Sequence, residues 1–253
     1  MTLKEFIHRY IVVHKCAGCS ELLEYERSHE AFCPTCKLAW NTAKTENCGN
    51  CFKEISECVC MPKQLSDAGA LTLRRLFFYS PERSAEPQNR IIYKLKNIKS
   101  KRYAGFVASQ LKSAVVEELK NLVDVDSREL SDKVFITYIP RSKKAVTSNG
   151  FDQSELICRE LSRLTGIEYV PVIKRSKSGK EQKSLTKAER FANTASLFEL
   201  DFDFSISGRY AILFDDIVTT GASMTACVKA LRKGRVKGVL CFCIATDKLK
   251  RQR

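Results

Sequence analysis

The second half of the chain alternates short apolar runs with amphipathic stretches. Four apolar runs after residue 133 predict strands at 134–139, 169–173, 210–214 and 236–245. Apolar positions at helical spacing predict helices at 156–164 and 222–232, and Gly166 is the expected C-terminal stop of the first helix. Because continuous apolar strands that alternate with helices are typical of parallel sheets covered on both faces, this half of the chain is predicted to be an α/β domain.

Before residue 133 the pattern is that of one extended segment followed by two helices. Residues 71–79 predict a strand or one arm of a short hairpin, and 80–84 predict a turn. Apolar residues at helical spacing recur at 91–98 and again at 106–119. A basic seam accompanies these two helices, formed by Lys94, Lys96, Lys99, Lys101 and Arg102.

The composition changes sharply near residue 62, because eight of the twelve cysteines lie at or before Cys60. The apolar fraction of 44% supports a folded core. We therefore divide the chain into a small cysteine-rich module at 1–62, a helical and hairpin connecting segment at 63–130, and the α/β domain at 131–253.

The eight N-terminal cysteines form four close pairs. No apolar run has the length of a membrane span, and the N-terminus has no signal-peptide core, so a cytoplasmic protein is expected. In a reducing compartment clustered thiols usually bind metal, and two such pairs complete a tetrahedral, structural zinc site. Sequential pairing predicts one site from Cys16, Cys19, Cys33 and Cys36 and a second from Cys48, Cys51, Cys58 and Cys60. An interleaved pairing is left open by the spacing.

The formal net charge is +14, which favours polyanionic partners such as phosphates, nucleotides, nucleic acid or an anionic lipid surface. Solubility alone would account for this charge equally well. The basic tail at 248–253 fits contact with nucleic acid, although no aromatic residues are interleaved with it for base stacking.

Two adjacent acids, Asp215 and Asp216, follow the apolar run at 210–214. Ligands of open α/β sheets bind at the carboxyl ends of strands, and paired acids there can accept hydrogen bonds from the vicinal hydroxyls of a ribose. The small and hydroxylated residues that follow lead into a helix, whose N-terminus favours a phosphate. Neither a Walker loop nor a GxGxxG fingerprint is present. The predicted ribose 5-phosphate site consists of Asp215, Asp216, Val218, Thr219, Thr220, Gly221, Ala222 and Ser223.

This acid-rich stretch resembles the phosphoribosyl diphosphate (PRPP) motif of type I phosphoribosyltransferases. Together with the cysteine-rich module and the segments Gly150–Gln153 and Arg190–Asn193, it makes most of the chain similar to the ComF family of competence-related proteins. The resemblance implies an α/β fold with a type I phosphoribosyltransferase-like parallel sheet and flanking helices, plus a small N-terminal zinc-ribbon module.

The resemblance also implies roles for individual residues. It implies PRPP, bound with Mg²⁺, as the ligand. Asn149 stands where the family pattern has arginine and Asp152 where it has asparagine, which weakens the expected grip on a diphosphate. The implied diphosphate-binding residues are Arg141, Ser142, Lys143 and Lys144, and the implied lid over the site carries Gln182, Arg190 and Asn193. If the domain is catalytic, the implied catalytic residues are Asp215, Asp216 and Arg175.

Two functions follow from the resemblance. The first is a protein that binds PRPP or a ribose 5-phosphate nucleotide and serves DNA uptake and natural transformation, with single-stranded DNA and competence or recombination proteins as partners. The alternative is an active phosphoribosyltransferase of nucleotide metabolism, in which an unknown acceptor displaces diphosphate. The departures at Asn149 and Asp152 favour the first.

Overall fold

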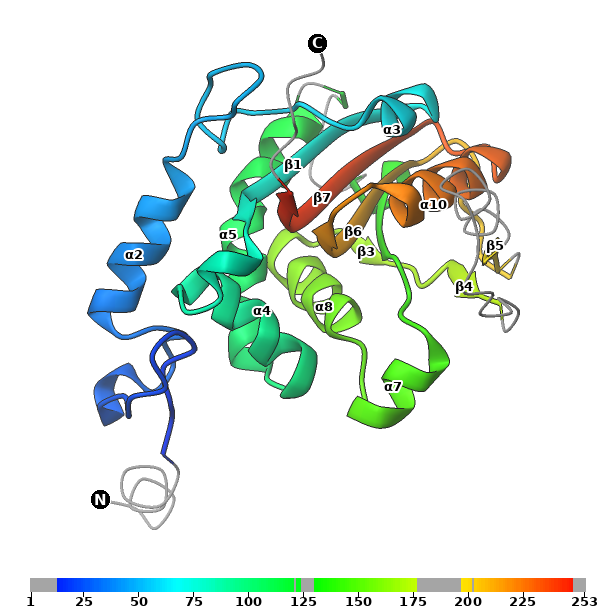
Figure 1. Cartoon of the computed structure of the whole chain (residues 1–253). Coiled ribbons are helices and arrows are strands. Elements are labelled where there is room, and N and C mark those ends of the chain that lie inside the picture. Colours follow the sequence, from blue (N-terminus) through cyan, green and yellow to red (C-terminus); the bar gives the residue numbers. More distant parts are fainter. Residues whose placement is uncertain (1–12, 121, 124–129, 177–196, 202, 248–253) are drawn as a thin grey trace, which may run out of the picture.

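The structure is a computed structural model that describes residues 13–120, 122–123, 130–176, 197–201 and 203–247. At its centre lies a sheet of five strands, all of them parallel, in the order β1-β7-β6-β2-β3 (Figure 1). The bounds of these strands are β1 Ala70–Tyr79, β2 Val134–Tyr138, β3 Glu168–Tyr169, β6 Tyr210–Val218 and β7 Gly238–Asp247. A separate antiparallel pair consists of β4 (Ile173–Arg175) and β5 (Phe198–Leu200).

Helices cover both faces of the parallel sheet, as the alternating pattern predicted. One face packs against α4 (Pro87–Asn97), α5 (Lys101–Lys120) and α8 (Gln153–Thr165). The other face packs against α3 (Lys63–Asp67) and α10 (Ala222–Lys233). The remaining elements are η1 Tyr25–Arg27, α2 Pro34–Lys44, η2 Pro81–Arg83, α6 Leu130–Lys133 and α7 Lys143–Asn149.

Side chains of the central strand β6 alternate between the two cores. Ile212 and Phe214 point into the core under α5 and α8, and Ala211 and Leu213 point into the core under α10. All four side chains are fully buried, which explains why the sequence of this strand is a continuous apolar run. Each such buried Ile, Leu or Phe stabilises the fold by about 1.5–3 kcal/mol.

The parallel edge strand β1 resolves the choice left open for residues 71–79. It pairs with β7 along nearly its whole length, from Ala70 opposite Val239 to Tyr79 opposite Asp247, so it is a sheet strand and not a hairpin arm. Residues 63–130 thus supply a strand of the central sheet and the helices α4 and α5 on one face. The domain boundaries at 62 and 130 stay predictions.

The single strand predicted at 169–173 is wrong, because the structure has two short strands there. Strand β3 ends at Tyr169, and β4 begins at Ile173 and pairs with β5 outside the central sheet. Pro171 lies between them and has no backbone N–H to donate to a strand ladder. The predicted helix stop at Gly166 is confirmed, because this residue caps α8 with a φ of 74°.

The cysteine-rich module packs against the helical face through one tryptophan. Trp40 of α2 is buried and contacts the rings of Phe32, Phe77 and Phe106, with ring centroids 5.1–5.5 Å apart. Its indole N–H donates to Gln110 Oε1 at 3.3 Å. Across the described ranges, we find no helix with the length and apolar character needed to cross a bilayer.

Candidate ribose-phosphate and metal sites

The acid pair and the loop after it lie together at the carboxyl end of the central strand. Asp215 and Asp216 are the sixth and seventh residues of β6, and α10 begins at Ala222, directly after the loop. Gly221 has a φ of 76°, a backbone conformation that favours glycine. A Cβ at this position would also lie only 3.3 Å from Pro62 Cγ, which is a second reason for glycine here.

A small pocket lies within this loop. It has a volume of about 50 Å³ and is lined by Asp215, Ile217, Val218, Thr219, Thr220, Gly221, Ala222, Ser223 and Met224. Pockets that enclose whole drug-sized ligands are roughly 300–1,000 Å³, so this one suits a single phosphate group. The N-terminus of α10 at its edge favours an anion there.

Four hydrogen bonds or ion pairs orient the two acids. Asp215 Oδ1 accepts from the backbone N–H of Asp216 at 2.8 Å, and Asp216 Oδ1 accepts from that of Ile217 at 2.7 Å. The other oxygen of Asp216, Oδ2, accepts from Gln153 Nε2 at 2.7 Å and pairs with Lys96 Nζ at 3.2 Å. Asp216 is therefore held from both sides in one orientation.

Burial, followed by the neighbouring Asp216 carboxylate, raises the pKa of Asp215 well above its ordinary value, and the backbone N–H of Asp216 opposes the rise only in part. An ionised carboxylate in that setting is stabilised by any ligand that brings hydrogen-bond donors or a cation to it. The hydroxyls of a ribose are such donors.

Residues 141–153, which follow the neighbouring strand β2 in the chain, support the acids. Arg141 donates from NH1 to Gln153 Oε1 at 2.8 Å, and Gln153 in turn donates to Asp216. Asp152 accepts from the backbone N–H groups of Arg141 at 2.8 Å and Ser154 at 2.9 Å, so the aspartate that replaces the family's asparagine caps α8. Burial raises the pKa of Asp152, and these N–H groups counteract it.

Of the four predicted diphosphate-binding residues, Arg141 is linked to the acid pair through Gln153, and both Arg141 and Ser142 also stabilise the protein itself. The Arg141 guanidinium orients Gln153, and the Ser142 hydroxyl caps α7 by accepting from the Ala145 N–H at 3.3 Å. Lys143 and Lys144 are exposed at the start of α7. Diphosphate binding by these four residues stays a prediction.

The predicted lid residues Gln182, Arg190 and Asn193 lie outside the described residues. Arg175 ends β4, with its guanidinium carbon 5.4 Å from the centre of the Phe198 ring. Its catalytic role stays a prediction.

Two residues that touch Asp216 had no predicted role. Gln153 was noted only as part of the family pattern, and Lys96 only as one of five cations in the basic seam. The helical spacing of α4 distinguishes buried from exposed faces, but it contains no signal that Lys96 reaches a strand much later in the chain.

The cysteines assemble in two tetrads, with the sequential pairing that the spacing suggested. In each tetrad the four sulfur atoms lie within 4.8 Å of one another, so the interleaved pairing does not occur. A tetrahedral zinc with Zn–S bonds of about 2.3 Å holds its sulfurs about 3.8 Å apart. Each tetrad could therefore hold one zinc ion.

Backbone N–H groups point at the buried sulfurs, as a bound thiolate requires. Cys16 Sγ accepts from Gly18 at 3.3 Å and Cys33 at 3.2 Å, and Cys48 Sγ accepts from Asn50 at 3.4 Å. Burial alone would raise the pKa of the Cys16 thiol, but the N–H groups outweigh it and lower the pKa to about 7. The donor sets of both tetrads thus fit zinc.

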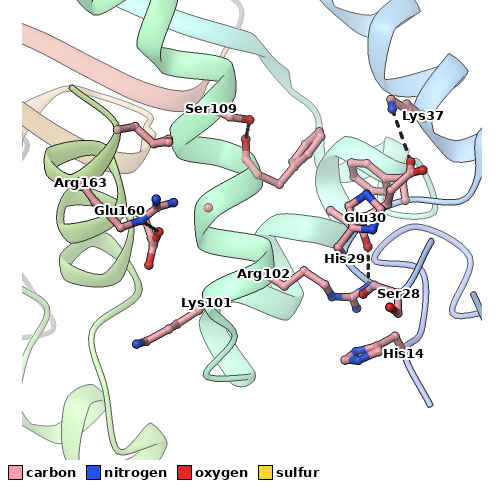
Figure 2. A pocket seen from close by; sticks show the side chains of 15 residues that line it. His14, Ser28, His29, Glu30, Lys37, Lys101, Arg102, Ser109, Glu160 and Arg163 are labelled. Carbon is pink, nitrogen blue, oxygen red and sulfur yellow. Dashed lines mark hydrogen bonds and ion pairs between the residues drawn. The ribbon is translucent and has the colours of Figure 1, made fainter. Parts of the chain in front are cut away.

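A larger groove lies away from the acid pair, between the cysteine-rich module and helices α5 and α8 (Figure 2). Its volume is about 860 Å³, and none of the predicted site residues lines it. Lys37, Lys101, Arg102 and Arg163 make its wall largely basic, although Glu30 pairs with Lys37 at 3.4 Å and Glu160 with Arg163 at 2.9 Å.

No family model matches the sequence. Among solved structures, a hypoxanthine phosphoribosyltransferase from Staphylococcus aureus is 10% identical, covering 62% of this chain and 72% of that one, with a TM-score of 0.34. An adenine phosphoribosyltransferase from Saccharomyces cerevisiae is 20% identical, covering 55% and 68%, with a TM-score of 0.33. The parallel strand order β1-β7-β6-β2-β3, with helices on both faces, defines the α/β fold.

Curated relatives match nearly the whole chain. The DNA utilization protein YhgH of Escherichia coli K12 is 24% identical over 227 residues, which cover 89% of this chain and 88% of that protein. The competence protein ComFC of Streptococcus pneumoniae is 25% identical over 229 residues, which cover 88% and 91%. These matches confirm the resemblance to the ComF family, and the chain is a homologue of YhgH and ComFC.

Proposed function

We propose that the chain binds PRPP, or a ribose 5-phosphate nucleotide, at the acid pair and the loop after it. The observation that carries this proposal is the juxtaposition of a phosphate-sized pocket with two oriented carboxylates at one strand end. The loop residues from Thr219 to Ser223 hold the 5-phosphate, and Asp215 and Asp216 accept hydrogen bonds from the ribose hydroxyls.

Mg²⁺ accompanies PRPP in this proposal. Oxygen ligands suit this ion, and it keeps several waters while bridging substrate phosphates. The acid pair offers carboxylate oxygens on the ribose side. Gln153 and Lys96 orient these oxygens. Lys143 and Lys144 are the proposed source of positive charge for the diphosphate.

The relatives' names support a role in DNA uptake, since one is a DNA utilization protein and the other a competence protein. We propose a role of the same kind for this chain, with zinc in both cysteine tetrads and a cytoplasmic location that keeps their thiols reduced. Transfer of the phosphoribosyl group to an acceptor is the second candidate, and the paired acids at the ribose position are what favours it.

Titration calorimetry with PRPP and Mg²⁺ tests the first proposal, and diphosphate release separates it from the second. We expect heat of binding in the calorimeter. With bases and amines present, we expect no more diphosphate release from PRPP than an Asp215→Asn, Asp216→Asn double variant shows. Release well above that variant would make the protein a transferase. No binding of PRPP or ribose 5-phosphate would reject both functions.

The groove of Figure 2 is the proposed contact surface for single-stranded DNA, because cations from three helices line it. We expect affinity for an oligodeoxythymidine to fall steeply between 50 and 200 mM salt, and Lys101→Gln with Arg163→Gln to flatten that slope by about 1.4 units. An unchanged slope in the double variant would exclude this groove. Competence or recombination proteins are the further proposed partners.

A further inference from the structure

The side chain of Lys96 reaches the acid pair from a helix outside the predicted site. Lys96 lies at the end of α4, one residue before the helix ends at Asn97. Its ammonium stands 3.2 Å from Asp216 Oδ2. Its side chain is 34% exposed, and an ammonium has three protons, so hydrogen-bond donors remain for a ligand after the bond to Asp216.

Lys96 contacts the acid that does not line the phosphate pocket. Asp215 lines that pocket, whereas Asp216 does not and instead contacts Gln153 and Lys96. A ligand with its 5-phosphate in the pocket and its ribose hydroxyls on the acids would extend its C1 substituent past the acids, so the ammonium that contacts Asp216 is a candidate partner for that substituent.

The main chain of Lys96 is anchored to the segment that departs from the family pattern. Its carbonyl oxygen accepts from Asn149 Nδ2, and Arg141 NH1 lies 3.5 Å from the same oxygen. Asn149 occupies the position at which the pattern has an arginine, so a cation is missing there and an amide holds the end of α4 instead.

The helix itself is tied to the cysteine-rich module. Two residues before Lys96, Lys94 donates from Nζ to the carbonyl of Cys16 at 3.1 Å and to Ser20 Oγ at 2.9 Å. Arg90, one turn earlier, donates to the carbonyl of Gly18 at 2.9 Å. Anchored at both ends, α4 presents Lys96 in a fixed place, which lowers the entropy lost when the ammonium binds a ligand.

We propose that Lys96 binds the anionic substituent on C1 of the phosphoribosyl ligand and supplies the positive charge that Asn149 lacks. This inference rests on the proposed function, because it assumes that the 5-phosphate and ribose occupy the loop and the acids. It makes the site selective for a ligand with a second anionic group, such as PRPP, over ribose 5-phosphate.

Titration calorimetry of Lys96→Met with two ligands, PRPP and ribose 5-phosphate, at one fixed Mg²⁺ concentration tests this. We expect PRPP affinity to fall about tenfold or more, as for loss of one charge-assisted hydrogen bond, and ribose 5-phosphate affinity to fall by a clearly smaller factor, because Gln153 still orients Asp216. Lys96→Arg should retain most PRPP affinity, and adding Asn149→Arg to Lys96→Met should restore part of it. Lys99→Met, an exposed lysine just beyond α4, is the matched control and should bind both ligands as the wild type does.

Three outcomes would overturn the inference. Equal losses for both ligands would mean that Lys96 only orients Asp216, and no loss for either would mean that it does neither. If the wild-type protein binds neither ligand, the proposed function fails and the inference fails with it. Thermal unfolding and zinc content measured on each variant separate these results from misfolding.

Discussion

Replacing Cys36 by alanine lowers the zinc content from about two ions to about one per chain and unfolds the first half of the cysteine-rich module. Cys36 is buried, and its sulfur is one of four that lie within 4.8 Å of each other. Structural zinc sites contribute apparent binding free energies of about 10–16 kcal/mol in small modules, so few residues would stay folded without the ion. Metal analysis measures the zinc content. Limited proteolysis measures the unfolding, as new cleavage sites in the module beyond residue 13.

The loss of structure should extend to α4 and α5, because side chains of these helices donate hydrogen bonds to backbone carbonyls in and beside the first tetrad. Lys94 donates to the Cys16 carbonyl at 3.1 Å, and Arg102 donates to the Lys15 carbonyl at 2.8 Å. The matched control is Cys158→Ala, which removes a buried cysteine of α8 and keeps both zinc ions. Two ions in Cys36→Ala, or none, would show that the tetrads are not independent zinc sites.

Replacing Asp216 by alanine is expected to weaken the proposed PRPP binding by about 100-fold or more. The variant loses the carboxylate that is proposed to accept from the ribose hydroxyls, and each hydrogen bond to a charged group is worth about 1.5–3 kcal/mol. It also leaves Gln153 Nε2 and Lys96 Nζ without the oxygen they share. Titration calorimetry with PRPP measures the loss.

Asp201→Ala is the control for this variant. Asp201 follows β5 and pairs with Lys174 at 2.7 Å, so its replacement also breaks a lysine–carboxylate pair, but away from β6. It should leave PRPP affinity unchanged. Wild-type affinity in Asp216→Ala would place the ribose elsewhere, whatever the loop after β6 binds.

The strand–turn–helix order of residues 215–223 and the two cysteine tetrads could be predicted because their parts are close in the chain, whereas ribose phosphate binding there stays a prediction. Residues 215–223 run from a strand through a turn into a helix, and the order of these three elements decides what lies next to what. In Cys16–Cys19, Cys33–Cys36 and Cys48–Cys51 two residues separate the cysteines, so a local turn brings the two sulfurs of each pair together. In the second tetrad the tighter Cys58–Cys60 pair also reaches the common position.

Contacts across the sheet could not be predicted in the same way. Asp216 meets Gln153 because α8, which begins at Gln153 and follows β2 in the chain, packs against β6, and this packing is decided over the whole domain. The split of residues 169–173 into two strands depends likewise on β5, a partner that follows only after residue 197. Apolar periodicity reports burial, and it does not report which strand is the neighbour.

Hydrophobic periodicity, cysteine spacing and the acid pair were therefore sufficient to predict an α/β sheet, two metal-binding tetrads and a place for a ribose 5-phosphate. Only the folded chain shows that β1 forms one edge of the sheet beside β7, and that Lys96 and Gln153 contact Asp216. The physical reason is the range of the interactions. Helix, strand and turn preferences act over a few residues, whereas a salt bridge from α4 to β6 exists only after the sheet and its helices have packed.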